Sequence, residues 1–279
     1  IFLKLFIDNK IIISWLFTNS SLAPSRIRTK IIAYFLIPFS YFIPKKIIVN
    51  GKKNLTFHKN IGFSNKFINI NNGFDPNEYK FAQRYKKINK KKLKISNEKT
   101  IIGMIARFDK YKDHDTFLKA ISLIVKEEKN LIFLLVGKNC DSKNQILIEK
   151  IKKLKISSYL KLLGYKKNME QVYSILNINI LTSNSESFPN VIAESMLSGV
   201  PSIASNVGEI KEIIGKTGWI IEKNEANLVY IYLKKAIKEF KDKKKWNLRK
   251  RECMKRIDKK YHIDQMIKTY DNAWISLII

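Results

Sequence analysis

The chain has few of the residues that cross-link small folds through disulfides or form metal sites. Its 279 residues include only two cysteines and three histidines. Cys140 and Cys253 stand far apart without zinc-type spacing, which argues against a disulfide framework or a zinc site and fits a reducing compartment. His58, His114 and His262 are scattered, and His114 is interpreted as a helix-start residue rather than a catalytic base. We therefore expect no metal site and no cofactor.

Long apolar runs are also missing. The most apolar stretch, Ile31–Pro44, is shorter than the roughly 20 residues that a membrane-spanning helix needs, and it contains Pro38. Two interpretations stay open: the stretch packs in a domain core, or it associates reversibly with an anionic membrane surface. The second interpretation rests on the basic residues that flank it, namely Arg26, Arg28, Lys30, Lys45 and Lys46.

Acidic residues are scarce. The sequence has 24 of them against 53 lysines and arginines, which gives a formal net charge of +29. Such an excess is typical of proteins that bind nucleic acid or anionic membranes. Here the excess is mostly lysine and is dispersed along the whole chain, so a solvated basic surface is the preferred interpretation. A basic module that binds nucleic acid or membrane is the alternative from another functional class.

Short apolar runs alternate with longer amphipathic ones, a pattern that predicts parallel, doubly wound α/β sheets. The stretch 113–130, for example, carries apolar residues at helical spacing. The polar and charged segment 89–99 interrupts the alternation and is interpreted as an interdomain linker. This leaves an incomplete first domain and a complete second one. The predicted strands lie near Ile12, Ile48 and Ile68 and begin near Thr100, Leu131, Tyr159, Ile178, Pro201 and Gly218.

The stretch "ESFPNVIAESMLSGVP" follows the predicted strand near Ile178 and begins a helix. Glu186 is expected in the loop before the helix, and Glu194 one to two turns inside it. In parallel sheets, ligands bind beyond the carboxyl ends of the strands, where helices present unpaired N–H groups. The N–H groups near Asn190 and Val191 could thus hold a phosphate, and Glu194 could accept hydrogen bonds from a ribose diol.

The stretch "GMIARFDKYKDH" forms a second strand-to-loop junction at the same predicted edge. Arg107 and Lys112 stand in this loop, where a planar guanidinium and an ammonium could grip a diphosphate. Without a bound metal, such a pair would neutralise a departing nucleoside diphosphate. The alternative is that both are ordinary solvated loop cations.

Together these motifs, with "INNGFDPNEY" and "SNVGEIKEII", resemble the retaining glycosyltransferases of family 4, and the resemblance covers nearly the whole chain. It implies a GT-B fold of two Rossmann-like domains and a nucleoside-diphosphate sugar donor. By resemblance, Arg107 and Lys112 bind the diphosphate, Glu194 holds the ribose, and Glu186 is the catalytic residue beside the transferred sugar. The backbone N–H groups of Phe188, Asn190 and Val191 would bind sugar hydroxyls and phosphate.

The resemblance also implies a domain plan: a partial acceptor-side domain (1–88), a linker (89–99), a donor-binding domain (100–260) and a helix that crosses back (261–279). The chain begins with Ile1 and is expected to be N-terminally truncated, so that it could be inactive as it stands. The expected reaction transfers a sugar with retention of configuration, by front-face attack and without a divalent metal. The acceptor would be a glycan or a lipid-linked glycan in surface polysaccharide synthesis. A nucleotide-sugar epimerase of the same fold is the alternative chemistry.

The expected location is the cytoplasm, with the inner face of the cell membrane as a possible docking surface. One departure from the family pattern stands out: Gly208 is followed by Glu209 where the family often has paired glycines. This substitution puts a close backbone contact with the donor in doubt. Ser20, Ser21 and Arg26 are candidates for the acceptor side, with ordinary loop residues as the alternative.

Overall fold

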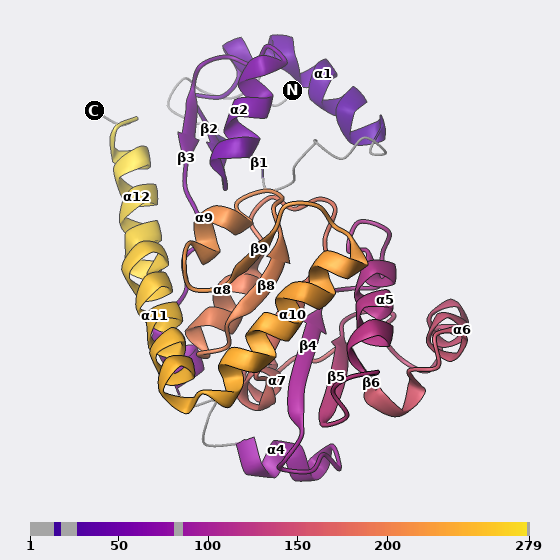
Figure 1. The fold of residues 1–279 in the computed structure, drawn as a ribbon. Coiled ribbons are helices and arrows are strands. Elements are labelled where there is room, and N and C mark those ends of the chain that lie inside the picture. Colours follow the sequence, from indigo (N-terminus) through magenta and orange to yellow (C-terminus); the bar gives the residue numbers. More distant parts are fainter. Residues whose placement is uncertain (1–13, 18–26, 81–85, 278–279) are drawn as a thin grey trace.

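The computed structural model describes residues 14–17, 27–80 and 86–277, which form two sheets of parallel strands (Figure 1). The described part of the first unit has a three-stranded sheet in the order β1-β2-β3. Its elements are β1 (Ser14–Phe17), α1 (Ile27–Phe42), β2 (Lys46–Val49), α2 (Lys52–Asn60) and β3 (Phe67–Asn69). Residues 10–13, where the first strand was predicted, lie outside the described residues.

The second unit has a six-stranded sheet within the described residues, in the order β6-β5-β4-β7-β8-β9. All of its strand pairings are parallel, as the alternation of apolar runs predicts. Its strands are β4 (Thr100–Ile105), β5 (Leu131–Val136), β6 (Leu160–Gly164), β7 (Ile178–Leu181), β8 (Ser202–Ser205) and β9 (Trp219–Ile221).

Helices cover both faces of this sheet (Figure 1). Every residue of β5 is buried, as are all residues of β4 after Thr100, because strands covered on both faces have no solvent side. The helices are α5 (His114–Ile124), α6 (Gln145–Lys153), α7 (Met169–Ile175), α8 (Asn190–Leu197), α9 (Ile210–Ile214), α10 (Ala226–Lys241) and α11 (Lys243–Tyr261), with the 3-10 turn η3 (Ser157–Tyr159).

The sheet order contains a topological switch point. The chain builds β4, β5 and β6 outward in one direction, then returns to place β7 on the other side of β4 and continues through β8 and β9. The loops after β4 and β7 therefore leave neighbouring strands in opposite directions. Doubly wound sheets bind ligands at such a switch point, beyond the carboxyl ends of the strands.

The last helix, α12 (Ile263–Ile275), leaves the second unit and runs beside the first sheet (Figure 1). Ala273 packs with Ile48 and Ile70 of the first unit in one small apolar cluster. At the crossing, the backbones of Phe74 and His262 pair as an isolated β-bridge. These contacts help to hold the two units together.

Among the described residues, the helices α3 (Pro76–Lys80) and α4 (Lys86–Lys92) lie between the two sheets in the sequence. Helix α4 overlaps the segment 89–99 that the sequence suggested as a linker, and Asn89 donates a hydrogen bond to Ser174 of α7 at 3.1 Å. The division of the chain at 89–99 stays a prediction. Within the described residues, no helix has the length and apolar character needed to span a bilayer.

Candidate active site

The candidate site lies at the switch point, where the loops after β4 and β7 meet. The Asn184 N–H donates to the Tyr111 carbonyl at 2.7 Å, and the Thr182 hydroxyl donates to the Asp113 carbonyl at 2.9 Å. These bonds join the loop that carries Arg107 and Lys112 to the loop that carries Glu186. The structure thus brings the two sequence motifs to one edge of the sheet.

Lys112 and Glu186 form the central ion pair of the site. The Lys112 Nζ lies 2.5 Å from the Glu186 Oε1, and their side chains are 20% and 10% exposed. The Ser183 hydroxyl donates to the same carboxylate oxygen at 2.6 Å. Because both charges are largely withdrawn from water, each depends on the other for compensation. A diphosphate that reached this ammonium would take over that role from the carboxylate.

Arg107 lies near the start of the loop that also carries Lys112. Of the predicted site residues that form ion pairs, Arg107 has the most exposed side chain. Its Nε donates to the Asp109 Oδ2 at 2.8 Å, while its side chain is 58% exposed. Burial alone would raise the pKa of Asp109, but hydrogen bonds from the Tyr111 N–H and from Arg107 outweigh it and lower that pKa. Asp109 therefore stays ionised and orients the guanidinium at the edge of the sheet.

Glu194 lies inside α8, as its position in the sequence predicts, and is held by a residue that the sequence analysis missed. Tyr173 of α7 is fully buried, and its hydroxyl donates to the Glu194 Oε2 at 2.8 Å. Burial raises the pKa of Glu194, and the Tyr173 hydrogen bond opposes that shift. Nothing in the sequence linked Tyr173 to a carboxylate 21 positions away.

The start of α8 offers N–H groups toward the first unit. The helix begins at Asn190 after Pro189 and has no side-chain cap, so its first N–H groups have no intrahelical acceptor. Phe188 is buried, and its ring stacks on Phe74 and meets Tyr261 edge-on, which fixes the loop before the helix. The Asn190 side chain accepts a hydrogen bond from Asn72 at 2.7 Å. Val191, which follows Asn190, is partly buried.

Asn224, which sequence reasoning did not single out, ties together several loops of this edge. Its amide nitrogen lies 2.7 Å from the Asp113 Oδ2, 2.5 Å from the Thr182 carbonyl and 3.1 Å from the Asn184 Oδ1. Asn224 follows β9, the strand at the far end of the sheet from β6. A single asparagine in a loop carries no periodic signal, so the sequence could not reveal this role.

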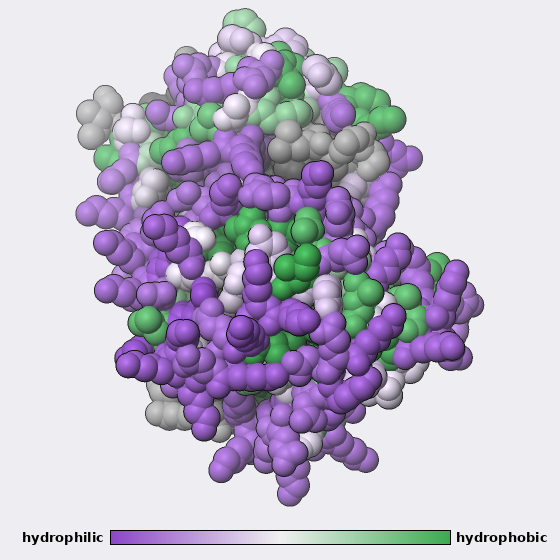
Figure 2. Space-filling model, viewed as in Figure 1, coloured by the Kyte–Doolittle hydropathy of each residue, from purple (hydrophilic) through white to green (hydrophobic). Residues whose placement is uncertain are grey.

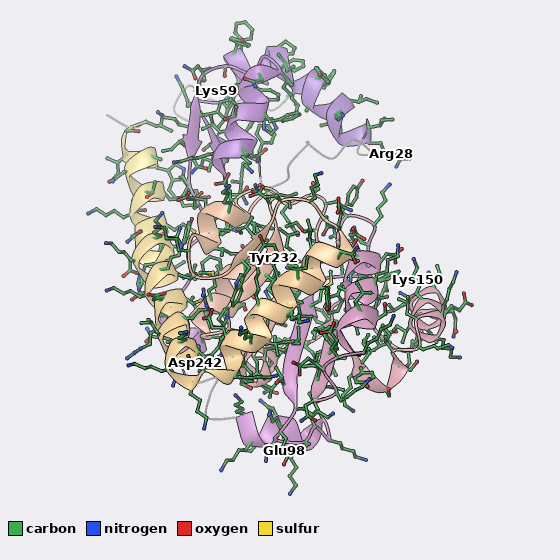
Figure 3. All side chains as sticks on the ribbon, viewed as in Figure 1. Arg28, Lys59, Glu98, Lys150, Tyr232 and Asp242 are labelled. Carbon is green, nitrogen blue, oxygen red and sulfur yellow. The ribbon has the colours of Figure 1, made fainter. Side chains whose placement is uncertain are left out.

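Asp113 and Asp115 form an Asp-x-Asp pair directly after Lys112, a pattern that can hold a divalent cation. In this structure the two carboxylates have different partners. Asp113 caps α5 by accepting from the Thr116 N–H at 3.2 Å, whereas Asp115 pairs with Lys150 of α6 at 2.6 Å, on the outer side of the molecule (Figure 3). Among the described residues, no group of three or more His, Cys, Asp or Glu side chains could hold a metal ion.

His114 is the first residue of α5 and is buried beneath the Arg107 loop. Desolvation by burial lowers its pKa to about 4, although the nearby carboxylates oppose the shift. Its Nε2 lies 3.6 Å from the Cys140 Sγ, and its Nδ1 is buried without a hydrogen-bond partner. A neutral, enclosed imidazole fits a structural role better than a catalytic one. The acceptor-side candidates Ser20, Ser21 and Arg26 lie outside the described residues.

Solved structures with the same architecture are GT-B glycosyltransferases. HepE from Anabaena, solved in complex with UDP and glucose, superimposes with a TM-score of 0.82 at 18% identity, over 95% of this chain and 72% of HepE. TarM of S. aureus, solved with UDP among its ligands, gives a TM-score of 0.76 at 16% identity, over 98% of this chain and 53% of TarM. The α/β, GT-B fold expected from the sequence is thereby confirmed.

The chain belongs to the glycosyl transferases group 1 family, whose profile matches residues 85–253. A 41.2 kDa protein from the capsule region of Klebsiella pneumoniae, itself uncharacterised, is 31% identical over 67% of this chain and 49% of its own length. The N-acetyl-alpha-D-glucosaminyl L-malate synthase of Bacillus anthracis is 26% identical over 68% of this chain and 49% of its own length. A capsular polysaccharide glycosyltransferase, CapM of Staphylococcus aureus, is 26% identical over 57% of this chain and 42% of its own. The chain spans about half the length of these curated relatives.

Proposed function

We propose that the chain belongs to a retaining glycosyltransferase of family 4, which moves a sugar from a nucleoside-diphosphate donor to a glycan or lipid-linked acceptor. The observation that carries this proposal is the Lys112–Glu186 pair at the switch point, with both side chains mostly buried and in contact at 2.5 Å. The capsular polysaccharide glycosyltransferase CapM among the relatives favours a role in surface polysaccharide synthesis.

In this proposal the donor diphosphate binds between the Arg107 loop and the start of α8. Lys112 and Arg107 supply the positive charge, and the backbone N–H groups of Phe188, Asn190 and Val191 add hydrogen bonds to phosphate and sugar hydroxyls. Glu194 accepts hydrogen bonds from the ribose. The two hydroxyls of a ribose would donate hydrogen bonds to the Glu194 carboxylate, in addition to the one from Tyr173.

The transfer step follows from the same arrangement. The bond between the anomeric carbon and the diphosphate oxygen breaks, and the cations stabilise the negative charge that develops on the leaving phosphate. The acceptor hydroxyl attacks from the same face, and its proton passes to that phosphate. Glu186, once released from Lys112, lies beside the transferred sugar and can support positive charge at the anomeric centre. The configuration of the sugar is thereby retained.

A nucleotide-sugar assay with proton NMR tests this function. The full-length protein is incubated with single UDP-, GDP- and dTDP-sugars, with and without a candidate acceptor. Release of nucleoside diphosphate and an α product from an α donor support a retaining transferase. An inverted product refutes retention, and an epimerised donor with its diphosphate intact identifies the epimerase alternative instead.

We further propose that α1 brings the protein to an anionic membrane surface. Several large apolar side chains on this helix are exposed, among them Phe35 at 62% and Phe42 at 78%. Green hydrophobic side chains are visible at the top of the molecule, over the first unit (Figure 2). Arg28 lies at the outer end of the same helix (Figure 3), and Lys45 follows it. An apolar face flanked by cations matches a surface of anionic lipid, on which a lipid-linked acceptor would lie.

A further inference from the structure

Helix α2 of the first unit begins in an electrostatically unfavourable way. Its N-cap, Gly51, provides no side-chain hydrogen bond, and its first turn contains Lys52 and Lys53 but no acidic residue. The N-terminus of a helix carries partial positive charge and unpaired N–H groups, so an acidic residue there stabilises it and lysines do not. The helix needs an acceptor from elsewhere.

Glu209 supplies that acceptor from the other unit, 156 positions along the chain. Its Oε1 accepts a hydrogen bond from the Lys53 N–H at 2.9 Å, and the residue is only 6% exposed. Gly51 lets the carboxylate approach: a Cβ at that position would lie 2.9 Å from the Glu209 Cγ. The side chain therefore caps α2 across the boundary between the two units.

The backbone of Glu209 is bound just as closely to the loop that carries Glu186. The Glu209 N–H donates to the Ser187 carbonyl at 2.9 Å. Gly208 has a φ of +53°, and a Cβ there would lie 2.5 Å from the carbonyl oxygens of Glu186 and Ser187. The Ser187 side chain in turn donates to the Asn50 side chain, directly before Gly51, at 2.9 Å. These hydrogen bonds connect the loop that carries Glu186 with the start of α2.

We propose that Glu209 is a positioning residue: its carboxylate, seated on the N-terminus of α2, fixes the first unit against the Glu186 loop and so sets the placement of the acceptor side. This inference rests on the proposed function, since only a transferase needs that placement. It also gives a physical meaning to the departure from paired glycines, because a second glycine would leave α2 uncapped. Glu209 lies in the second unit and contacts helix α2 of the first unit. This role requires no contact between Glu209 and the nucleotide sugar.

Hydrogen exchange of the α2 amides, read by NMR, tests the contact without any reference to activity. In Glu209→Ala the Lys53 amide loses its acceptor, and its exchange should accelerate by about tenfold, the effect of losing a helix N-cap. Glu209→Gln keeps the shape and one acceptor oxygen but loses the charge. Its Lys53 exchange rate should lie between the rates of the wild type and of Glu209→Ala. The control is Glu212→Ala, which removes an acid three positions away that pairs with Lys260 at 2.8 Å within the second unit. Glu212 also lies within electrostatic reach of Lys52, but it accepts no hydrogen bond from the Lys53 N–H, so Glu212→Ala should change the Lys53 exchange far less than Glu209→Ala does.

A second variant breaks the contact from the first unit and leaves the donor side untouched. Gly51→Ala places a methyl group against the Glu209 Cγ, and it should accelerate the same amide. Because both changes disrupt one contact, the double variant with Glu209→Ala should exchange no faster than the faster single variant. Unchanged Lys53 exchange in Glu209→Ala, an equal change in Glu212→Ala, or additive effects in the double variant would overturn the proposal.

Steady-state kinetics then separates positioning from binding in the full-length enzyme. Glu209→Ala should lower kcat for transfer by about tenfold while its affinity for the nucleoside diphosphate stays within about twofold of the wild type, since Lys112 and Arg107 are intact. Equal loss of kcat in Glu212→Ala would refute a specific role. If no nucleotide sugar is turned over at all, the proposed function fails, whereas the exchange result still decides whether Glu209 joins the two units.

Discussion

Replacing Tyr173 with phenylalanine tests whether Glu194 is a tuned, buried carboxylate. The substitution removes one hydroxyl, which donates to the Glu194 Oε2 at 2.8 Å, and it leaves the ring in place. Near neutral pH the carboxylate then stays largely buried without its donor. Hydrogen bonds to charged groups contribute about 1.5–3 kcal/mol, so Tyr173→Phe should lower the free energy of unfolding by that amount.

The loss should depend on pH in a defined direction. Burial raises the pKa of Glu194 above its ordinary value of 4.5. A raised pKa means that this group's contribution to stability is complete below the unfolded pKa and is lost as the pH rises through the folded pKa. Tyr173 limits that loss because its hydrogen bond lowers the pKa. In Tyr173→Phe the pKa of Glu194 rises further, so the variant loses more stability between acidic and neutral pH than the wild type does.

Urea unfolding at about pH 4 and about pH 7 measures both effects. At the lower pH Glu194 is protonated, and only a neutral hydrogen bond is missing, which is worth about 1 kcal/mol. The difference between wild type and variant should therefore grow by about 1 kcal/mol on going to pH 7. Tyr79→Phe is the control, because its ring meets Tyr173 edge-on at 6.2 Å but the described residues give its hydroxyl no hydrogen bond. Equal, pH-independent losses in the two variants would contradict the assignment.

Three further predictions concern the loops, the metal and the membrane. Asn224→Ala should destabilise the second unit by about 1–3 kcal/mol, because it removes an amide donor from the Thr182 carbonyl and from the Asp113 carboxylate, which keeps its bonds from Thr116. Unfolding curves that match the wild type would be inconsistent with a stabilising role of Asn224 between these loops. Sugar transfer should survive excess chelator, because protein cations neutralise the diphosphate, and loss of activity that magnesium restores would count against this. In liposome flotation, binding should require anionic lipid and fall as salt rises; Phe35→Ser should weaken it, and no binding at low salt would leave only a packing role for α1.

The sequence predicted the second unit well because apolar runs there report burial directly. Strands β4 and β5 begin where their runs begin, at Thr100 and Leu131, and the stripe on α5 that includes Phe117 and Ile121 is buried as expected. Proline and the polar loop before it placed the start of α8 within one residue. These signals are local, so a single sequence carries them.

The parts that the sequence missed depend on contacts between distant residues. The sequence analysis did not single out Tyr173, and only the fold shows that its hydroxyl donates to Glu194. In the sequence, Glu209 stands out only because the family often has a glycine at this position. In the structure, its carboxylate caps a helix of the other unit. Lys112 and Glu186 were both predicted as site residues, but their direct ion pair was not, since each was assigned to a bound donor. Residues that come into contact only through the tertiary structure produce no periodic pattern in the sequence.

The central claim is that Lys112 belongs to a diphosphate site, and calorimetric titration with UDP tests it most directly. Lys112→Ala should weaken UDP binding by about 1.5–3 kcal/mol, the contribution of a charge-assisted hydrogen bond, and Arg107→Ala should act in the same direction. Lys110→Ala is the matched control, because Lys110 is an exposed lysine of the same loop that lies over the Tyr111 ring; it removes the same charge and should leave the affinity within about twofold of the wild type. Unchanged binding in Lys112→Ala, or an equal loss in Lys110→Ala, would contradict the account.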